Sequence, residues 1–289
     1  MPHTPAGGVM IAYPDMPQAK KKDHFSKHHF VGGNAFMLNI FQDNISPLGI
    51  TASTVRLEDT KLRTLEQLQS DTASLSILDA NLRDDALSVA LQVTNKVGHK
   101  FPTGFPSRRA WLYFTVADRT GTVIFESGRP RENGSVTGDN ADDNMTYEPH
   151  YDRITQPDQV QIYEAVMRNT DGEVTYTLLR GAGYIKDNRL LPAGFDKKTA
   201  HSDIAPAGMA AKDDNFEGGS DKITYEVKVG DHKGPFTVRA ELCYTPVSYS
   251  FMEDLLADEN LKLVNRFSRY YDRADKTPVT VDLLLTEVR

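Results

Sequence analysis

From Ser74 to the C-terminus, the sequence is a succession of short runs rich in Val, Thr, Tyr, Phe and Leu, separated by turn sequences such as Asp-Arg-Thr-Gly and Thr-Asp-Gly. Most of these runs alternate apolar and polar residues, which is the period of a strand with one buried face. Strands at this spacing predict a mainly β fold, an antiparallel immunoglobulin-like β-sandwich. The predicted strands are LSVALQVTN, AWLYFTVAD, TVIFESG, EVTYTLLRG, DKITYEVKV, FTVRAELCY and TPVTVDLLLTEV. The predicted core includes Val89, Leu91, Trp111, Phe114, Val238 and Leu242.

The sequence divides into three predicted parts. Residues 1–33 form an extended arm rich in His, Pro and Lys, residues 34–73 a helical segment, and residues 74–289 the sandwich domain. Ser53 is a predicted N-cap, and a helical insert is expected from Ser250 to about Asp272. The apolar positions at helical spacing are Phe36, Met37, Ile40, Phe41, Val55, Leu57, Leu62, Leu65 and Leu68 in the segment, and Leu255, Leu256, Leu261, Leu263 and Phe267 in the insert.

Charge and cysteine content exclude several classes of function. The formal net charge of −7 argues against nucleic acid as the main partner, because phosphate binding needs a basic surface. Cys243 is the sole cysteine, so no intrachain disulfide, Cys-x-x-Cys motif or thiolate zinc site can form, and we expect it to be a buried apolar residue. No run reaches the roughly 20 apolar residues of a transmembrane helix. The N-terminus carries no signal-peptide pattern, and it can equally have lost its beginning.

The stretch NKVGHKFPTGFPSRRAW, residues 95–111, is a shaped loop between two predicted strands. Two Phe-Pro steps and Gly104 restrict its backbone, and rigid flanking strands commonly mount binding residues on such loops. His99 fits either a ligand held at a fixed position or a loop histidine bonded to the backbone. Of Arg108 and Arg109, we expect one to face the core beside Glu126 or Asp118 and the other to meet an anionic group.

Four of the eight histidines lie in the predicted arm, at positions 3, 24, 28 and 29. Imidazole is a neutral nitrogen ligand for iron or zinc. His24 and His28 are four residues apart and could share one helix face, whereas His28 and His29 point in different directions in any regular structure. A zinc site would need further ligands from elsewhere, and a polar arm with solvent-exposed histidines explains the same pattern.

The predicted loops 129–157 and 188–219 are long and acidic, and loops of this length are usually functional or disordered. Within the first, Asp142, Asn144 and Glu148 offer oxygen ligands for calcium, although their spacing is not that of an EF-hand and solvated carboxylates are the simpler interpretation. The sequence has no phosphate-binding Gly-rich loop, Gly-x-Ser-x-Gly or His-Glu-x-x-His motif. We therefore expect no catalysis by this chain alone and leave enzymatic activity open.

Several motifs, taken together and in order, resemble the C-terminal half of bacterial multihaem c-type cytochromes. They are HHFVGGN, GHKFPTGFPSRRAWL, FESG, EPHYDRI, QVQIYE, KDNRLLPAGFDK and the strands DKITYEV and FTVRAELCY, and they cover most of the chain. In that family the haem-bearing part comes first and a β-rich domain follows. This sequence lacks the Cys-x-x-Cys-His motif that attaches haem c, so the chain itself should carry no covalent haem. It opens with Met1-Pro2, as though it began directly after such a motif, which indicates a fragment; a haem-free protein is the alternative.

The resemblance implies a role in electron transfer, with haem c on a missing N-terminal part or on a redox partner protein, in the periplasm or outside the cell. It implies that His99 and His29 or His28 are distal haem ligands, with His24 and His150 as weaker candidates. Arg108 or Arg109 would meet a haem propionate. Two other functions stay open: a haem-free sandwich that binds calcium, a partner protein or a polysaccharide, and an accessory domain of a multihaem oxidoreductase.

Overall fold

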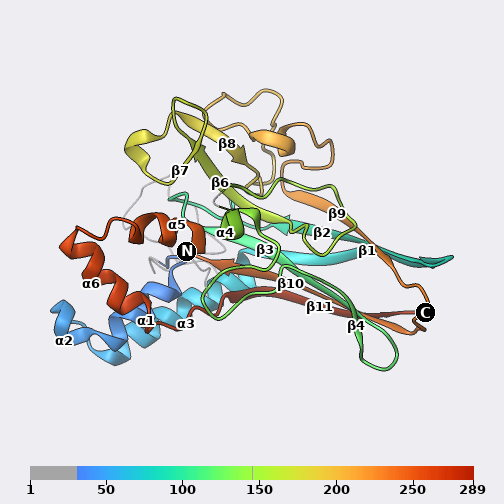
Figure 1. Ribbon diagram of the computed structural model, residues 1–289, viewed down its shortest axis with the longest axis horizontal. Helices are drawn as coiled ribbons and strands as arrows, with labels where there is room; N and C mark the ends of the chain where they lie inside the picture. Colours follow the sequence, from blue (N-terminus) through green and yellow to red (C-terminus); the bar gives the residue numbers. More distant parts are fainter. Residues whose placement is uncertain (1–30, 145) are drawn as a thin grey trace, which may run out of the picture.

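The computed structural model describes residues 31–144 and 146–289 of the chain (Figure 1). His3, His24, His28 and His29, with nearly all of the predicted arm, lie outside the described residues. Within the described part, no helix is long and apolar enough to cross a lipid bilayer. The order of elements is three helices, then strands interrupted by one short α-helix and two 3₁₀ helices, then two helices before the last strand.

Three helices precede the sandwich: α1 (Ala35–Asp43), α2 (Ile45–Leu48) and α3 (Thr54–Asp71). Each long helix begins at a side-chain cap, because Asn34 accepts from the backbone N–H of Met37 and Ser53 accepts from that of Arg56. The predicted Ser53 cap is therefore confirmed. The expected apolar face of α3 is only half right: Leu57 and Leu68 are buried, whereas Val55 and Leu62 are exposed.

The rest of the chain forms a mainly antiparallel sandwich of two sheets, as predicted (Figure 1). One sheet has the order β1 (Ala73–Arg83), β2 (Ala86–Asn95), β9 (Ser220–Lys228) and β5 (Arg153–Ile154), of which only the short β5–β9 pair in the described chain is parallel. The other has the order β11 (Val279–Val288), β10 (Phe236–Thr245), β3 (Arg109–Ala117), β6 (Ile162–Arg168) and β7 (Val174–Thr175). In addition, β4 (Val123–Ser127) pairs with β3, and β8 (Gly183–Asp187) pairs with β6.

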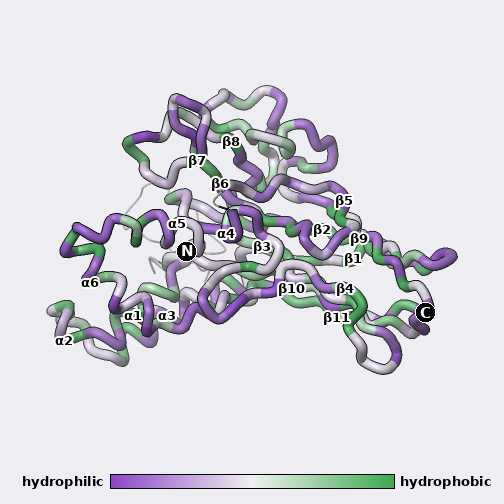
Figure 2. The backbone as a smooth tube through the Cα atoms, viewed as in Figure 1, coloured by the Kyte–Doolittle hydropathy of each residue, from purple (hydrophilic) through white to green (hydrophobic). Residues whose placement is uncertain are grey.

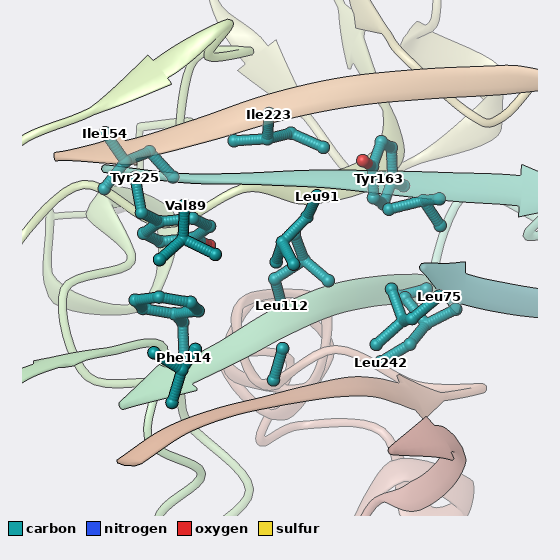
Figure 3. Packing of buried hydrophobic residues seen from close by; sticks show 14 of the residues in the cluster. Leu75, Val89, Leu91, Leu112, Phe114, Ile154, Tyr163, Ile223, Tyr225 and Leu242 are labelled. Atoms are coloured by element: carbon teal, nitrogen blue, oxygen red, sulfur yellow. The ribbon is translucent and has the colours of Figure 1, made fainter. Parts of the chain in front are cut away.

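The core lies between the inner faces of the two sheets. Phe114 of β3 stacks on Tyr225 of β9, with ring centroids 3.8 Å apart and planes 14° apart, and this contact joins the sheets at their centre (Figure 3). At the edge of the sandwich, the Asp282 carboxylate of β11 accepts a 2.7 Å hydrogen bond from the backbone N–H of Leu75 in β1. All six residues predicted for the core are buried.

A second, smaller cluster covers the outer face of the seven-stranded sheet around Trp111. Its ring packs with Val136, Val160, Ile162 and Cys243, and its indole N–H donates to the Gly128 carbonyl at 2.9 Å. Residues 129–160, which include the short helix α4 (Asn140–Asn144), thus form a packed cover. Cys243 is buried as predicted, and burial raises the pKa of its thiol.

The loop between β8 and β9 also packs on the sandwich. It contains the short 3₁₀ helix η2 (Gly208–Ala211), and a second one, η1 (Leu178–Arg180), follows β7. Leu190, Leu191, Ala210 and Phe216 from this loop enter the main core. Figure 2 shows hydrophobic residues along the strands and hydrophilic residues over much of the loops around β7 and β8.

The helical insert consists of two helices, α5 (Tyr249–Leu256) and α6 (Lys262–Tyr271), at the end of the sandwich where α1 and α3 also lie (Figure 1). Phe36 of α1 meets Tyr271 of α6 edge to face, with centroids 5.9 Å apart. The expected apolar face of the insert was wrong in part, because Leu261 and Leu263 are exposed, the latter to 77%. The buried positions of α6 are Val264 and Tyr271, so its contact surface is rotated from the predicted one.

We expect Phe114→Ala to lower the free energy of unfolding by about 3 to 5 kcal/mol, because it removes a ring from the junction of both sheets and leaves a cavity. Leu285→Ala on β11 is the control: its side chain is 68% exposed, and the change should be within about 0.5 kcal/mol. Urea titrations followed by Trp111 fluorescence measure both. Equal effects of the two substitutions would contradict the assigned core.

Candidate functional site

The loop between β2 and β3, residues 96–108, lies at the end of the sandwich that carries α5 (Figure 1). Phe105 from this loop meets Phe251 of α5 edge to face at 5.6 Å, and Phe251 in turn meets Tyr176, which follows β7, at 6.3 Å. The loop tip is therefore supported by α5, which Tyr176 packs against in turn.

Asn95, the last residue of β2, fixes the backbone around His99. Its buried amide nitrogen donates to the carbonyl of His99 at 2.8 Å and to that of Leu190 at 3.0 Å. Its amide oxygen accepts from the N–H of Val97 at 2.9 Å. Phe101 and Leu190 exchange two further backbone hydrogen bonds, at 3.0 and 2.8 Å. The two motifs GHKFP and KDNRLLP are therefore joined into one structure.

Lys100 and Arg189 strengthen this junction through Asp187, the last residue of β8. The Lys100 ammonium lies 2.7 Å from the buried Asp187 carboxylate, and Arg189 donates to both carboxylate oxygens, at 2.9 and 2.7 Å. Burial lowers the pKa of Lys100, and Asp187 opposes that shift. One carboxylate thus holds two cations, which leaves this part of the loop with a net positive charge.

The His99 side chain is exposed, and its Nδ1 lies 3.0 Å from the carbonyl oxygen of Lys100. A carbonyl oxygen can only accept, so Nδ1 carries the proton and Nε2 keeps its lone pair. No described residue bonds to Nε2. A histidine that binds a metal commonly donates its other ring N–H to a carbonyl or carboxylate in this way. His99 therefore has the tautomer and the exposure that a metal ligand needs.

The chain that follows the arm histidines passes close to this loop. Phe101 packs on Tyr244 of β10, with ring centroids 5.7 Å apart. A Cβ atom added at Gly33, four residues after His29, would lie 3.1 Å from the Tyr244 hydroxyl. Tyr244 also lines a cavity of about 360 Å³ between α1, α3 and residues 275–280. The chain after the predicted ligands His28 and His29 is thus placed beside the structure that carries His99.

Arg109 is fully buried, so it is the arginine of the pair that faces the core, and its listing among the ligand-binding candidates gains no support. Its guanidinium donates to Asp139 at 2.6 Å, to both oxygens of Asp142 at 2.9 and 2.8 Å, and to the carbonyl of Gly134 at 3.1 Å. It also lies over the ring of Trp111.

The expected partners of the buried arginine were wrong, because Glu126 contacts Tyr113 and Arg129, and Asp118 contacts His232. Arg108 is half-buried, with its guanidinium 3.3 Å from where a Cβ of Gly104 would lie. Gly104 has a φ of +82°, and it leaves room for that guanidinium. Of the arginine pair, only Arg108 remains a candidate for an anionic partner.

The carboxylates proposed for calcium are used by the protein itself. Asp142 accepts from Arg109 and from the backbone N–H groups of Val136 and Ser250. The buried Glu148 accepts from the N–H groups of Asn140 and Val160, both at 3.2 Å. Asn144 ends α4. The calcium prediction therefore gains no support from these residues.

Sequence reasoning missed a buried polar cluster around His150. Its Nε2 lies 3.0 Å from Asp213 and 4.0 Å from Asp221, so the three side chains are close enough to suggest a metal site. Its Nδ1, however, faces the amide nitrogens of Gln161 at 2.8 Å and Asn188 at 3.1 Å.

Both amides are fixed by other bonds. The Gln161 oxygen accepts from the N–H of Tyr151, and the Asn188 oxygen accepts from that of Glu164. Nδ1 of His150 must therefore accept, and the proton lies on Nε2 and points at Asp213. A metal at Nε2 would displace that proton with no place for it on Nδ1, so these bonds give no support to His150 as the weaker haem ligand expected from the sequence, and they instead join the surrounding loops through His150. Burial raises the pKa of Asp221 to about 6.

Comparisons with known proteins give one similarity. No protein-family model and no curated protein matches the sequence. A solved penta-haem cytochrome c552 from Thermochromatium tepidum matches with a TM-score of 0.42 and 14% sequence identity. The match covers 77% of this chain and 41% of that one, so the chain spans less than half the length of the cytochrome.

The Arg109 cluster predicts a pH dependence of stability. Burial raises the pKa of Asp139 to about 8, well above the ordinary carboxyl value near 4, and the neighbouring Asp142 adds to the shift. The folded state therefore holds this proton more tightly, and the resulting stability is full below about pH 4 and is lost as the pH rises to about 8. Between pH 6 and 9 we expect the free energy of unfolding to fall by about 2 to 3 kcal/mol.

Asp139→Asn should flatten this pH dependence, because an amide does not titrate in that range. Asp143→Asn, at an exposed position of α4, should leave it unchanged. Urea unfolding at four pH values measures the slopes. The same slope in all three proteins would show that Asp139 carries no such proton.

Asn95→Ala should loosen the His99 loop, because two carbonyl groups lose a donor. We expect a loss of about 2 kcal/mol of stability and faster tryptic cleavage after Lys96 and Lys100. Asn81→Ala on β1, where the amide bonds the exposed Asp79, is the matched control. If both variants resist trypsin as the wild type does, Asn95 does not fix the loop.

Proposed function

We propose that this chain is the β-rich C-terminal part of a multihaem electron-transfer protein and that His99 is a distal axial ligand of one of its haem irons. The observation that supports the proposal most directly is the His99 ring itself. It is exposed, its Nδ1–H donates to the Lys100 carbonyl at 3.0 Å, and Nε2 is left free among the described residues.

The chemistry of axial ligation suits this arrangement. A low-spin haem iron takes the lone pair of an imidazole nitrogen, and a hydrogen bond from the opposite ring nitrogen fixes the ring and raises its donor strength. The iron–nitrogen bond tolerates little displacement of the ring, so the ligand needs a rigid mount. Asn95, the Phe101–Leu190 pair and the Lys100–Asp187 ion pair supply it.

The surroundings of His99 fit a haem edge. Lys100, Arg108 and Arg189 give the loop positive charge, which suits a propionate, and Arg108 is the most accessible candidate from the predicted pair. Gly33, which follows His29 by four residues, lies close beside the Tyr244 hydroxyl, since a Cβ there would lie 3.1 Å from it, and Tyr244 packs on Phe101 of the His99 loop. We propose His29 or His28 as a second distal ligand, with His24 as a further candidate.

This function would place the haem on a preceding part of a longer protein or on a redox partner, in the periplasm or outside the cell. The sequence resemblance is the basis for that location. A haem-free sandwich that binds a partner or a polysaccharide is the competing function, and it predicts no role for the Nε2 lone pair of His99.

The test uses an N-acetylated haem peptide that keeps one histidine ligand and has one open axial position. To reduce the number of competing exposed histidines to His232, the four arm histidines and His201 are replaced by glutamine in the full chain. Adding this protein should convert the peptide haem from high to low spin, seen as a shift of its Soret band. His99→Ala should remove one binding phase, with at least a tenfold loss of affinity at that site.

His99→Gln, which keeps a polar side chain of similar length, should lose the same phase, and its circular dichroism spectrum should match the parent protein. If the haem peptide binds the His99 variants as tightly and in the same number as the parent, the ligand role of His99 is wrong.

A further inference from the structure

A second histidine, at the opposite end of β3 from His99, has the same free ring nitrogen. His232 lies in the turn between β9 and β10, and Asp118 lies in the turn after β3. The N–H of Arg119 donates to the carbonyl of Lys233 at 3.1 Å, which ties the two turns together. His232 is therefore mounted where two hairpins meet, and its side chain is 45% exposed.

Asp118 orients this ring. One of its carboxylate oxygens accepts from the N–H of Thr120 at 2.9 Å, from the Thr120 hydroxyl at 2.6 Å and from the N–H of Thr122 at 3.1 Å. The other lies 2.8 Å from Nδ1 of His232. The Thr120 hydroxyl and the His232 ring, in that order, hold the pKa of Asp118 well below its usual range. The carboxylate is thus ionised and can only accept.

The proton of neutral His232 therefore lies on Nδ1, and Nε2 keeps its lone pair. Among the residues the structure describes, nothing bonds to that nitrogen. A carboxylate that accepts from the far nitrogen of an imidazole is a common support of metal-binding histidines, because it fixes the ring and makes the ligating nitrogen more basic. His232 has this support in a stronger form than His99, whose acceptor is a neutral carbonyl.

The other two described histidines lack this arrangement. His150 is buried and has its proton on Nε2, directed at Asp213. His201 is highly exposed, and its Nδ1 has only a 3.4 Å contact with the N–H of Asp203 and one of the same length with the Asp203 carboxylate. The combination of a fixed Nδ1–H donor and an exposed, free Nε2 thus occurs at His99 and His232 alone within the described chain.

We propose that His232 is a second exposed axial ligand, which takes a haem iron with one open coordination position. β3, which separates the two loops, runs from Arg109 to Ala117 and spans about 26 Å at roughly 3.3 Å per residue. One haem cannot reach both rings, so the two ligands would serve two separate haem centres at opposite ends of the sandwich. The identity of the metal group rests on the proposed function, whereas the geometry of His232 does not.

The test uses the same haem peptide and the same glutamine background, in which His99 and His232 are the exposed histidines that remain. We expect two haem peptides per chain, one after either His99→Ala or His232→Ala, and none after both. Asp118→Asn should weaken binding at His232 about 10- to 100-fold and leave the His99 site unchanged. A ¹⁵N spectrum of the histidine rings at pH 8.5 should show the Nδ1–H tautomer for His232.

The outcomes separate the two ideas. If His232→Ala leaves the number of bound haem peptides unchanged, the proposal for His232 is wrong, and its pairing with Asp118 only joins the two turns. If His99→Ala removes the His99 phase and retains the His232 phase, both assignments are supported. If His232→Ala removes a bound haem peptide and His99→Ala has no effect, the assignment of His232 is supported and the proposed role of His99 is wrong. Circular dichroism and urea unfolding of each variant identify any that fail to fold.

Discussion

The packing of Phe114 on Tyr225 is the contact on which the rest of this structure depends. It joins β3 to β9, and β3 is the strand that carries the His99 loop at one end and the Asp118 turn at the other. Because β3 also pairs with β4, β6 and β10, its position fixes most of the seven-stranded sheet.

Buried charges then fix the long loops to the sandwich. Arg109 on β3 holds residues 134–142 through Gly134, Asp139 and Asp142, and Asp187 holds Lys100 and Arg189. A charge removed from water is costly unless it is paired. Each loop therefore supplies the partners that the buried charge on the neighbouring strand needs. This explains why loops with an acidic composition are packed and ordered rather than solvated.

The sequence predicted the structure best where apolar residues recur with a regular period, because that period marks the buried face of an element. Alternation predicted most of the strands and the six core residues, because each strand of the sandwich has one inner face. The predicted strand EVTYTLLRG was wrong: only the two residues of β7 are strand, and the 3₁₀ helix η1 follows them. Helix faces were less predictable: Val55 and Leu62 of α3, and Leu261 and Leu263 of the insert, are apolar but exposed, because these helices use a narrow stripe against the sandwich. Hydrophobicity alone cannot show which part of a wide apolar face finds a partner.

For the candidate site, local motifs predicted a shaped loop but not the groups that orient the His99 ring, and the ligand role of His99 stays a prediction. Asn95 to Leu190 and Arg109 to Asp139 are contacts between distant positions, and no spacing rule connects them. The ring of His232 depends on Asp118, which is 114 residues away in the chain. Asp118 lies in one turn and His232 in another, far apart in the sequence. Such a pair forms no sequence pattern that could be recognised in a single chain.

The double backbone pairing of Phe101 with Leu190 has a consequence for protein engineering. The GHKFP loop takes its shape from a strand-like partner that lies 89 residues later, so the loop is one half of a two-part unit. Grafting the loop alone onto another sandwich would transfer its prolines and glycines but not its shape. A transplant of the site must carry residues 95–101 and 187–190 together, because Asn95 and Asp187 bond the two segments to each other.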